Sequence, residues 1–296
     1  MPMPRRTTLA HLATASALGV LLTACQSSTP AGQTHPQPAS ASPQQQSTTT
    51  PPRAATDPGL TPRERLLTLA GNVGGTPADA ATGLPYTYLH TQSWTRATNK
   101  ITRTDLQRWR RDADDSGREV TRRLPDVPGL AHRPTQAERD DFATARRTTT
   151  PYLAGDLKAY LTEPLPTDAT ALASALAPRE LAGRPAYPRI LVHGVTGLAT
   201  HQYLNQDQRR TTLRVLAAVP NIAYQGEQTD LAGRTGLGFT LTADGSTTQL
   251  IIKPDTGELL SAQEQVAGAR PGLFSCVLIL DRGHAVNDTE TPSTQP

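Results

Sequence analysis

The sequence lacks the short motifs that indicate the best-known catalytic chemistries. It contains no H-E-x-x-H, no C-x-x-C pair and no G-x-S-x-G elbow, which excludes the common zinc-peptidase, dithiol and serine-hydrolase signatures. The seven histidines are scattered, and His193 and His201 have no acidic neighbour at ligand spacing. We therefore predict no catalytic residue, no metal site and no cofactor, and a protein that is not an enzyme.

The sequence also lacks an apolar segment at its N-terminus long enough for a membrane-spanning helix. The apolar run there covers residues 9–22, short of the roughly 20 apolar residues that cross a bilayer. It follows Arg5 and Arg6 and ends in small residues, an order that is typical of a secretory signal. The signal closes with Leu22-Thr23-Ala24-Cys25, which resembles the lipobox of bacterial lipoproteins.

The lipobox resemblance implies that Cys25 carries lipid. Residues 1–24 would then be a cleaved signal peptide, and the mature protein would be anchored at the extracytoplasmic face of the cell membrane. An ordinary cleaved signal without lipid is the alternative. Residues 25–60 are rich in Ser, Thr, Pro and Gln, and we predict that they form a disordered linker because they cannot bury enough apolar surface.

The sequence has few cysteines and a small net charge. With Cys25 lipidated, Cys276 has no partner in its own chain, which excludes a disulfide scaffold. Cys276 lies in the apolar run 273–280 and is predicted to be a buried core residue. The formal net charge is +3, and removal of Arg5 and Arg6 lowers it to +1. A nucleic-acid-binding protein needs a concentrated basic face, so no nucleic-acid partner is predicted.

The remaining sequence predicts one α+β domain over residues 61–283, a curved antiparallel β-sheet with helices packed on one face. A loose tail follows at 284–296. N- and C-terminal strands are expected to share the sheet, because neither half has enough strands for a stable two-layer core. Strands are expected at 86–94, 106–111, 118–124, 222–228, 237–241, 248–253, 258–266 and 273–280, and helices at 62–70, 153–161, 168–177 and 207–219.

Two short patterns begin like binding loops without completing them. Asp112-Ala-Asp-Asp-Ser-Gly117 starts like a calcium loop, but Arg123 stands at the position that requires a bidentate glutamate. A polar hairpin turn explains the same residues. The glycine-rich stretch 233–238 leads into a strand rather than a helix, so it offers no helix N-terminus to a phosphate.

Several stretches carry a family resemblance when taken together. They are Tyr86–Trp94, Arg108–Arg110 with Asp115–Arg118, Asp255–Leu260 and Leu278–Asp281. In this combination the chain resembles an uncharacterised family of actinobacterial secreted and membrane-anchored proteins, for which the resemblance implies no activity. More distantly, the order of long strands is similar to the lipoprotein-carrier and envelope-stress-sensor half-barrels, which hold acyl chains in the concave face of a curved sheet. The three helices expected in the middle of the chain depart from a simple half-barrel.

Two functions follow as hypotheses. The first is a non-enzymatic envelope lipoprotein that binds a lipid or acyl chain, or an envelope protein partner. The second is an envelope hydrolase with a site built from distant residues, such as His193 or His201 beside a carboxylate and a hydroxyl. Five inward side chains of the C-terminal strands are candidates for lining an apolar ligand-binding hollow: Leu237, Phe239, Leu241, Leu250 and Ile252. Alternatively, helices from the middle of the chain fill that hollow completely.

Overall fold

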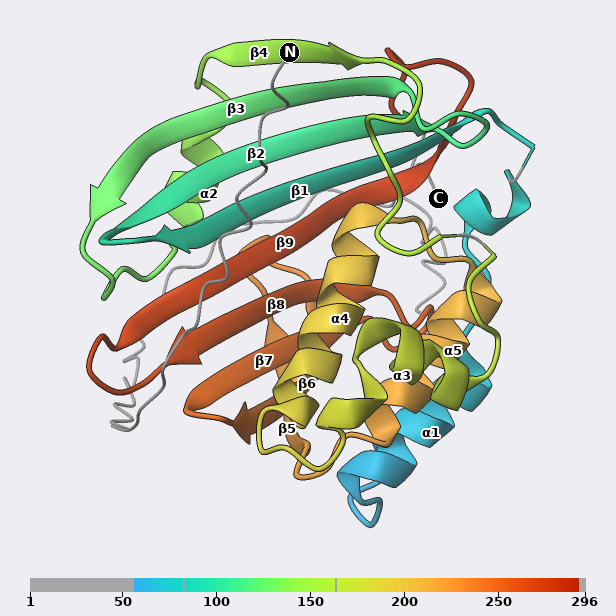
Figure 1. Ribbon diagram of the computed structural model, residues 1–296, viewed down its shortest axis with the longest axis vertical. Coiled ribbons are helices and arrows are strands. Elements are labelled where there is room, and N and C mark those ends of the chain that lie inside the picture. The colour runs from blue at the N-terminus through green and yellow to red at the C-terminus, as the bar shows by residue number, and fades with distance from the viewer. Residues whose placement is uncertain (1–55, 82, 163, 293–296) are drawn as a thin grey trace, which may run out of the picture.

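The computed structural model describes residues 56–81, 83–162 and 164–292 (Figure 1). Cys25, residues 1–24 and nearly all of the predicted linker lie outside the described residues. The predictions of signal cleavage and lipidation therefore stay predictions.

The described strands form one open, curved, antiparallel sheet in the order β4-β3-β2-β1-β9-β8-β7-β6-β5 (Figure 1). Their bounds are β1 Tyr86–Ala97, β2 Lys100–Arg111, β3 Gly117–Pro128, β4 Arg147–Tyr152, β5 Ala223–Thr229, β6 Thr235–Ala243, β7 Ser246–Ile252, β8 Leu259–Val266 and β9 Gly272–Ala285. The last strand, β9, is the middle strand of the sheet and pairs with β1 and β8. The predicted α+β class is confirmed, as is the prediction that strands from both ends of the chain share one sheet.

The helices begin at side-chain caps or prolines. The α-helices are α1 Pro62–Asn72, α2 Gln136–Asp141, α3 Ala169–Leu176, α4 Tyr187–His201 and α5 Gln206–Ala217, and the short 3-10 helices are η2 Pro77–Ala80 and η3 Arg179–Leu181. The predicted cap of α1 is confirmed, because the Thr61 side chain and the Glu64 side chain each bind the other's backbone N–H. In α3 the cap is Asp168, one residue later than the predicted Thr167.

Helices α1, α3, α4 and α5 cover one face of the sheet over its C-terminal half, while the short helix α2 lies on the other side of β1 to β3 (Figure 1). Side chains of β9 alternate between the two faces, so Val277 packs in the helix-covered cluster and Cys276 in the opposite one. Near Cys276, Trp94 of β1 packs edge-on against Phe142, which follows α2. The predicted burial of Cys276 is confirmed, and this burial raises the pKa of its thiol to about 12.

The prediction of a helix at 153–161 is wrong. The chain leaves β4 and runs through turns across the β2–β3 connection, where Gly155 has a φ of 82°. Its backbone N–H donates to the carbonyl of Asp114, and that of Leu157 donates to the carbonyl of Asp115. These bonds to another part of the chain replace the helical ones, which a pattern of apolar spacing cannot anticipate.

The longest helix, α4, was not expected from the sequence. Gly194 and Gly197 lower its helix propensity. Because they have no side chain, however, both allow other residues to pack closely against the helix. A Cβ at Gly194 would lie 2.8 Å from the Cβ of Leu176, and one at Gly197 would lie 2.6 Å from the ring of Tyr160. Tertiary packing therefore accounts for this helix. Among the described residues, no helix has both the length and the apolar composition needed to cross a membrane.

Candidate functional site

The site lies where the sheet opens between β8 and β9. Their pairing ends at Ser261 and Leu278, while β9 continues along β1 as far as Ala285. Both strands bulge at this point: Leu260 is the extra residue of β8 against β7, and Leu280 is the extra residue of β9 against β1. Bulges bend strands and redirect side chains. The divergence therefore separates β8 from β9 and leaves backbone carbonyls without a neighbouring strand.

Two arginines donate to those carbonyls. Arg234, from the β5–β6 turn, donates to the carbonyl of Ile279 at 2.6 Å and to that of Leu260 at 2.9 Å. Arg282 donates to the carbonyl of Leu259 at 2.5 Å. Buried carbonyls need a donor wherever the ladder stops. The guanidinium groups thus hold the two strands apart at a fixed separation.

Arg234 is itself held by Asp230 at the other end of the same turn. Its Nε lies 2.9 Å and its Nη2 2.5 Å from Oδ2 of Asp230. Oδ1 of Asp230 accepts from the backbone N–H groups of Ala232 and Arg234. The Asp230 side chain is 1% exposed. This carboxylate depends on Arg234 for its only ion pair among the described residues.

Glu258 lies close to the two other cationic side chains on this side of the opening. Its Oε2 accepts from the Thr256 hydroxyl at 2.8 Å and lies 4.0 Å from Nζ of Lys253, and its Oε1 lies 3.5 Å from Nε of Arg282. Burial on its own would raise the pKa of Glu258. Arg282 and the Thr256 hydroxyl outweigh that effect and hold the pKa below its usual range. The negative charge of Glu258 is therefore balanced by nearby cations and a hydrogen bond.

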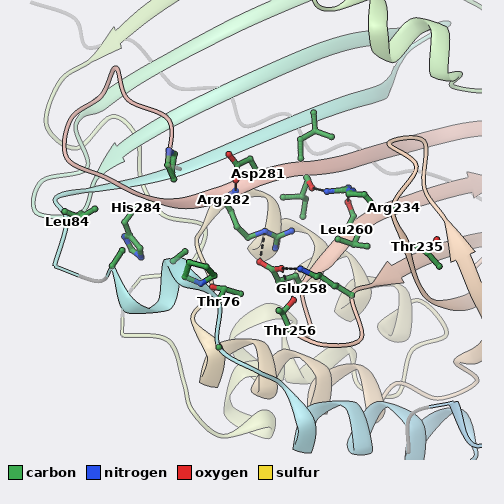
Figure 2. A pocket seen from close by; sticks show the side chains of 18 residues that line it. Thr76, Leu84, Arg234, Thr235, Thr256, Glu258, Leu260, Asp281, Arg282 and His284 are labelled. Carbon is green, nitrogen blue, oxygen red and sulfur yellow. Dashed lines mark hydrogen bonds and ion pairs between the residues drawn. The ribbon is translucent and has the colours of Figure 1, made fainter. Parts of the chain in front are cut away.

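The opening encloses a cavity of about 660 Å³ (Figure 2). Helix η2 covers one side of it, and the charged residues Arg234, Lys253, Glu258 and Arg282 lie in its lining. Apolar side chains make up much of the remaining wall: Pro77, Ala78, Ala81, Leu84, Leu260 and Leu280. The cavity thus combines an apolar wall with fixed charges, the usual make-up of a small-molecule site.

Helix η2 is held in place by Asp79. Its carboxylate accepts from Arg209 at 2.8 Å, from the hydroxyl of Tyr203 at 2.8 Å and from the backbone of Thr76 at 2.6 Å. Burial on its own would raise the pKa of Asp79, but these hydrogen bonds and the Arg209 charge lower it to about 2. The wall formed by η2 is thereby fixed to helix α5.

Asp281 is the lining carboxylate that has no ion-pair partner among the described residues. Its Oδ1 accepts from the backbone N–H of Arg282 at 2.8 Å, and no cation lies within ion-pair distance. His90 stands opposite Asp281 across β1 and β9, but its Nε2 is bound to Asp105 at 2.9 Å. Burial raises the pKa of the Asp281 carboxyl. The Arg282 backbone hydrogen bond and the nearby charges of His90 and Arg282 lower this pKa but only partly offset the effect of burial.

The five residues predicted to line a hollow lie elsewhere. Leu237, Phe239, Leu241, Leu250 and Ile252 are all at most 3% exposed and belong to the core beneath α1, α3, α4 and α5. None lines the large cavity, and Ile252 borders only a void of about 20 Å³. Their arrangement matches the alternative in which helices fill the hollow, and binding at these residues stays a prediction.

The histidines singled out from the sequence do not assemble a nucleophile. Nε2 of His193 lies 2.5 Å from Oε2 of Glu264, whose Oε1 accepts from Arg189 and from the hydroxyl of Ser246. The carboxylate separates the hydroxyl from the imidazole, whereas an activated serine must donate to its base. Nδ1 of His201 lies 2.8 Å from the carbonyl of Gly197 and 3.0 Å from the Thr200 hydroxyl, which donates to the carbonyl of Thr196. No carboxylate lies within ion-pair distance of His201 among the described residues, and burial lowers its pKa.

The calcium-like loop is a hairpin turn. Asp112 accepts from the Thr87 hydroxyl at 2.7 Å and from Arg110 at 3.0 Å, while Asp114 accepts from Ser116. Among the described residues, no group of three or more His, Cys, Asp or Glu side chains could hold a metal ion.

None of the cavity residues was predicted as a site residue, although a signal for some of them was present. Thr256, Glu258 and Leu260 lie in the stretch 255–260, and Asp281 ends the stretch 278–281. Both stretches carried the family resemblance, and the fold brings them to one cavity. Arg234 lies in the glycine-rich stretch 233–238, but no pattern there marked its side chain as a site residue.

Comparisons with known proteins place the chain in no family. No family model and no curated protein matches it. A solved structure of MucB in complex with MucA(peri) is similar with 12% sequence identity and a TM-score of 0.30, over 79% of this chain and 59% of MucB. This chain thus spans less than two thirds of MucB, and a likeness of this extent carries no conclusion about function.

Proposed function

We propose that this protein is a non-enzymatic envelope protein, tethered through Cys25, that binds an amphipathic ligand in the cavity between β8 and β9. The observation that carries the proposal is the cavity itself, with apolar side chains and fixed charges around one space of about 660 Å³. Binding sites for small molecules commonly enclose 300–1,000 Å³. A ligand with an alkyl or acyl chain would place that chain against the apolar wall.

The charges in the cavity support binding rather than catalysis. The guanidinium groups of Arg234 and Arg282 donate to backbone carbonyls and contact Asp230 and Glu258 respectively. A general acid or base needs a proton that it can exchange with substrate. These groups are engaged in holding the strands apart, so they shape the site.

Filling the cavity tests the proposal. Ala81 lines the cavity, whereas Ala80 is exposed and does not line it. In the purified full-length protein, Ala81→Trp should reduce saturable uptake of the uncharged fluorescent probe N-phenyl-1-naphthylamine at least tenfold, and Ala80→Trp should leave it unchanged. Absence of saturable uptake by the unaltered protein, or equal uptake by both variants, would contradict binding in this cavity.

A further inference from the structure

We propose that Asp281 selects a cationic amphiphile, so that the ligand carries a primary amine or guanidinium group beside its apolar chain. This inference rests on the proposed function and adds the charge of the ligand's head group. It starts from the distribution of charge around the cavity and from the position of Asp281 on β9.

The cations that line the cavity each have an anion nearby. Arg234 contacts Asp230, and both Arg282 and Lys253 lie within 4.0 Å of Glu258. An anionic head group would therefore compete with carboxylates that are already in place. Every lining cation already has a carboxylate within ion-pair distance, although Arg282 and Lys253 share that of Glu258.

Asp281, in contrast to these cations, lacks an ion-pair partner among the described residues. No described cation lies within ion-pair distance of it, and its neighbour across the sheet, His90, is bound to Asp105. In Figure 2 the Arg282 side chain extends toward Glu258, and Asp281 points away from that group. A carboxylate at a partly desolvated cavity wall gains a charge-assisted hydrogen bond from an incoming ammonium group.

A β-bulge directly precedes Asp281. Leu280 is the extra residue of β9, so the chain direction changes immediately before Asp281. Leu280 and Leu260 line the same cavity. A ligand whose alkyl chain contacts these two leucines would bring a head group at one end of that chain to Asp281.

Displacement by three ligands of equal chain length tests the inference. Decylamine, decanol and decanoate share one chain and differ in charge. With N-phenyl-1-naphthylamine bound to the purified full-length protein at neutral pH and low salt, decylamine should displace the probe at a concentration at least tenfold lower than either of the others. Asp281→Asn, which has the same shape, should remove that preference. Asp255→Asn, in the nearby β7–β8 turn and outside the cavity lining, should retain it.

The outcomes separate the two proposals. Probe binding with equal displacement by all three ligands, or a preference for decanoate, overturns the role of Asp281 and leaves cavity binding standing. An amine preference that survives in Asp281→Asn also overturns it. Failure of the unaltered protein to bind the probe overturns the proposed function itself. Probe uptake by Asp281→Asn shows that the variant is folded.

Discussion

Replacing Arg234 by methionine should destabilise the protein by about 3 kcal/mol, because it breaks a buried ion pair from one side. The change leaves the Asp230 carboxylate, 1% exposed, without its cation and leaves the carbonyls of Leu260 and Ile279 without their donor. Removing one partner of a buried pair typically costs about 3–5 kcal/mol. The lower end applies because Asp230 retains two backbone donors and the Arg234 side chain is 29% exposed.

Urea-induced unfolding followed by circular dichroism measures this loss. The double variant Asp230→Asn with Arg234→Met should be more stable than Arg234→Met alone, since it removes the uncompensated charge. Arg270→Met is the matched control: Arg270 also donates to a backbone carbonyl, that of Thr98, but is exposed. It should change the free energy of unfolding by less than about 0.5 kcal/mol. A loss below about 1 kcal/mol for Arg234→Met would refute the argument that this guanidinium holds the opening together.

Four further predictions concern the anchor, the core and pH. Cys25→Ala should move the protein out of the membrane fraction or leave it unprocessed, whereas a fully soluble wild-type protein with no added mass on its N-terminal peptide would contradict lipidation. Cys276 should resist a thiol reagent until the protein is denatured, and Cys276→Ala should cost on the order of 1 kcal/mol in urea titration; rapid native labelling would contradict its burial. Phe239→Asp should unfold the domain, because it buries an unpaired charge, and a folded variant with weakened fatty-acid uptake would instead support the hollow predicted from the sequence. The pKa of Asp79 is about 2, below its usual value of 3.8, so its contribution to stability is present above about pH 4 and is lost as the pH falls toward 2; thermal unfolding should show a shallower acid dependence in Asp79→Asn, and an unchanged dependence would contradict the pairing of Asp79 with Arg209.

The C-terminal strands could be predicted because their turns are encoded locally. The Asp244-Gly245 turn and the Pro254–Gly257 turn separate strands of alternating apolar residues, and each observed strand there lies within a few residues of the expected one. Turn chemistry of this kind acts over four residues. It requires no knowledge of the rest of the fold.

Helix α4 and the cavity could not be predicted in the same way. In α4, Gly194 lowers helix propensity. Its missing side chain is an advantage only in the folded protein, where Leu176 of α3 packs against it. The cavity depends on the point at which β8 and β9 part, and on Arg234 reaching across from another turn. Such contacts join residues far apart in the sequence, so no local pattern reveals them.

The central position of β9 has a consequence for how the protein folds. The strand synthesised last is the one that joins β4-β3-β2-β1 to β8-β7-β6-β5. Until it is available, two four-stranded sheets would each present an open edge at the place where β9 belongs. Pairing Thr95 with Ser275 closes a very long loop, and contacts of such sequence separation slow folding. Chains that end before Gly272 should therefore pair with unpaired strands of other molecules and aggregate. Once β9 is present, the two four-stranded halves form one cooperative unit.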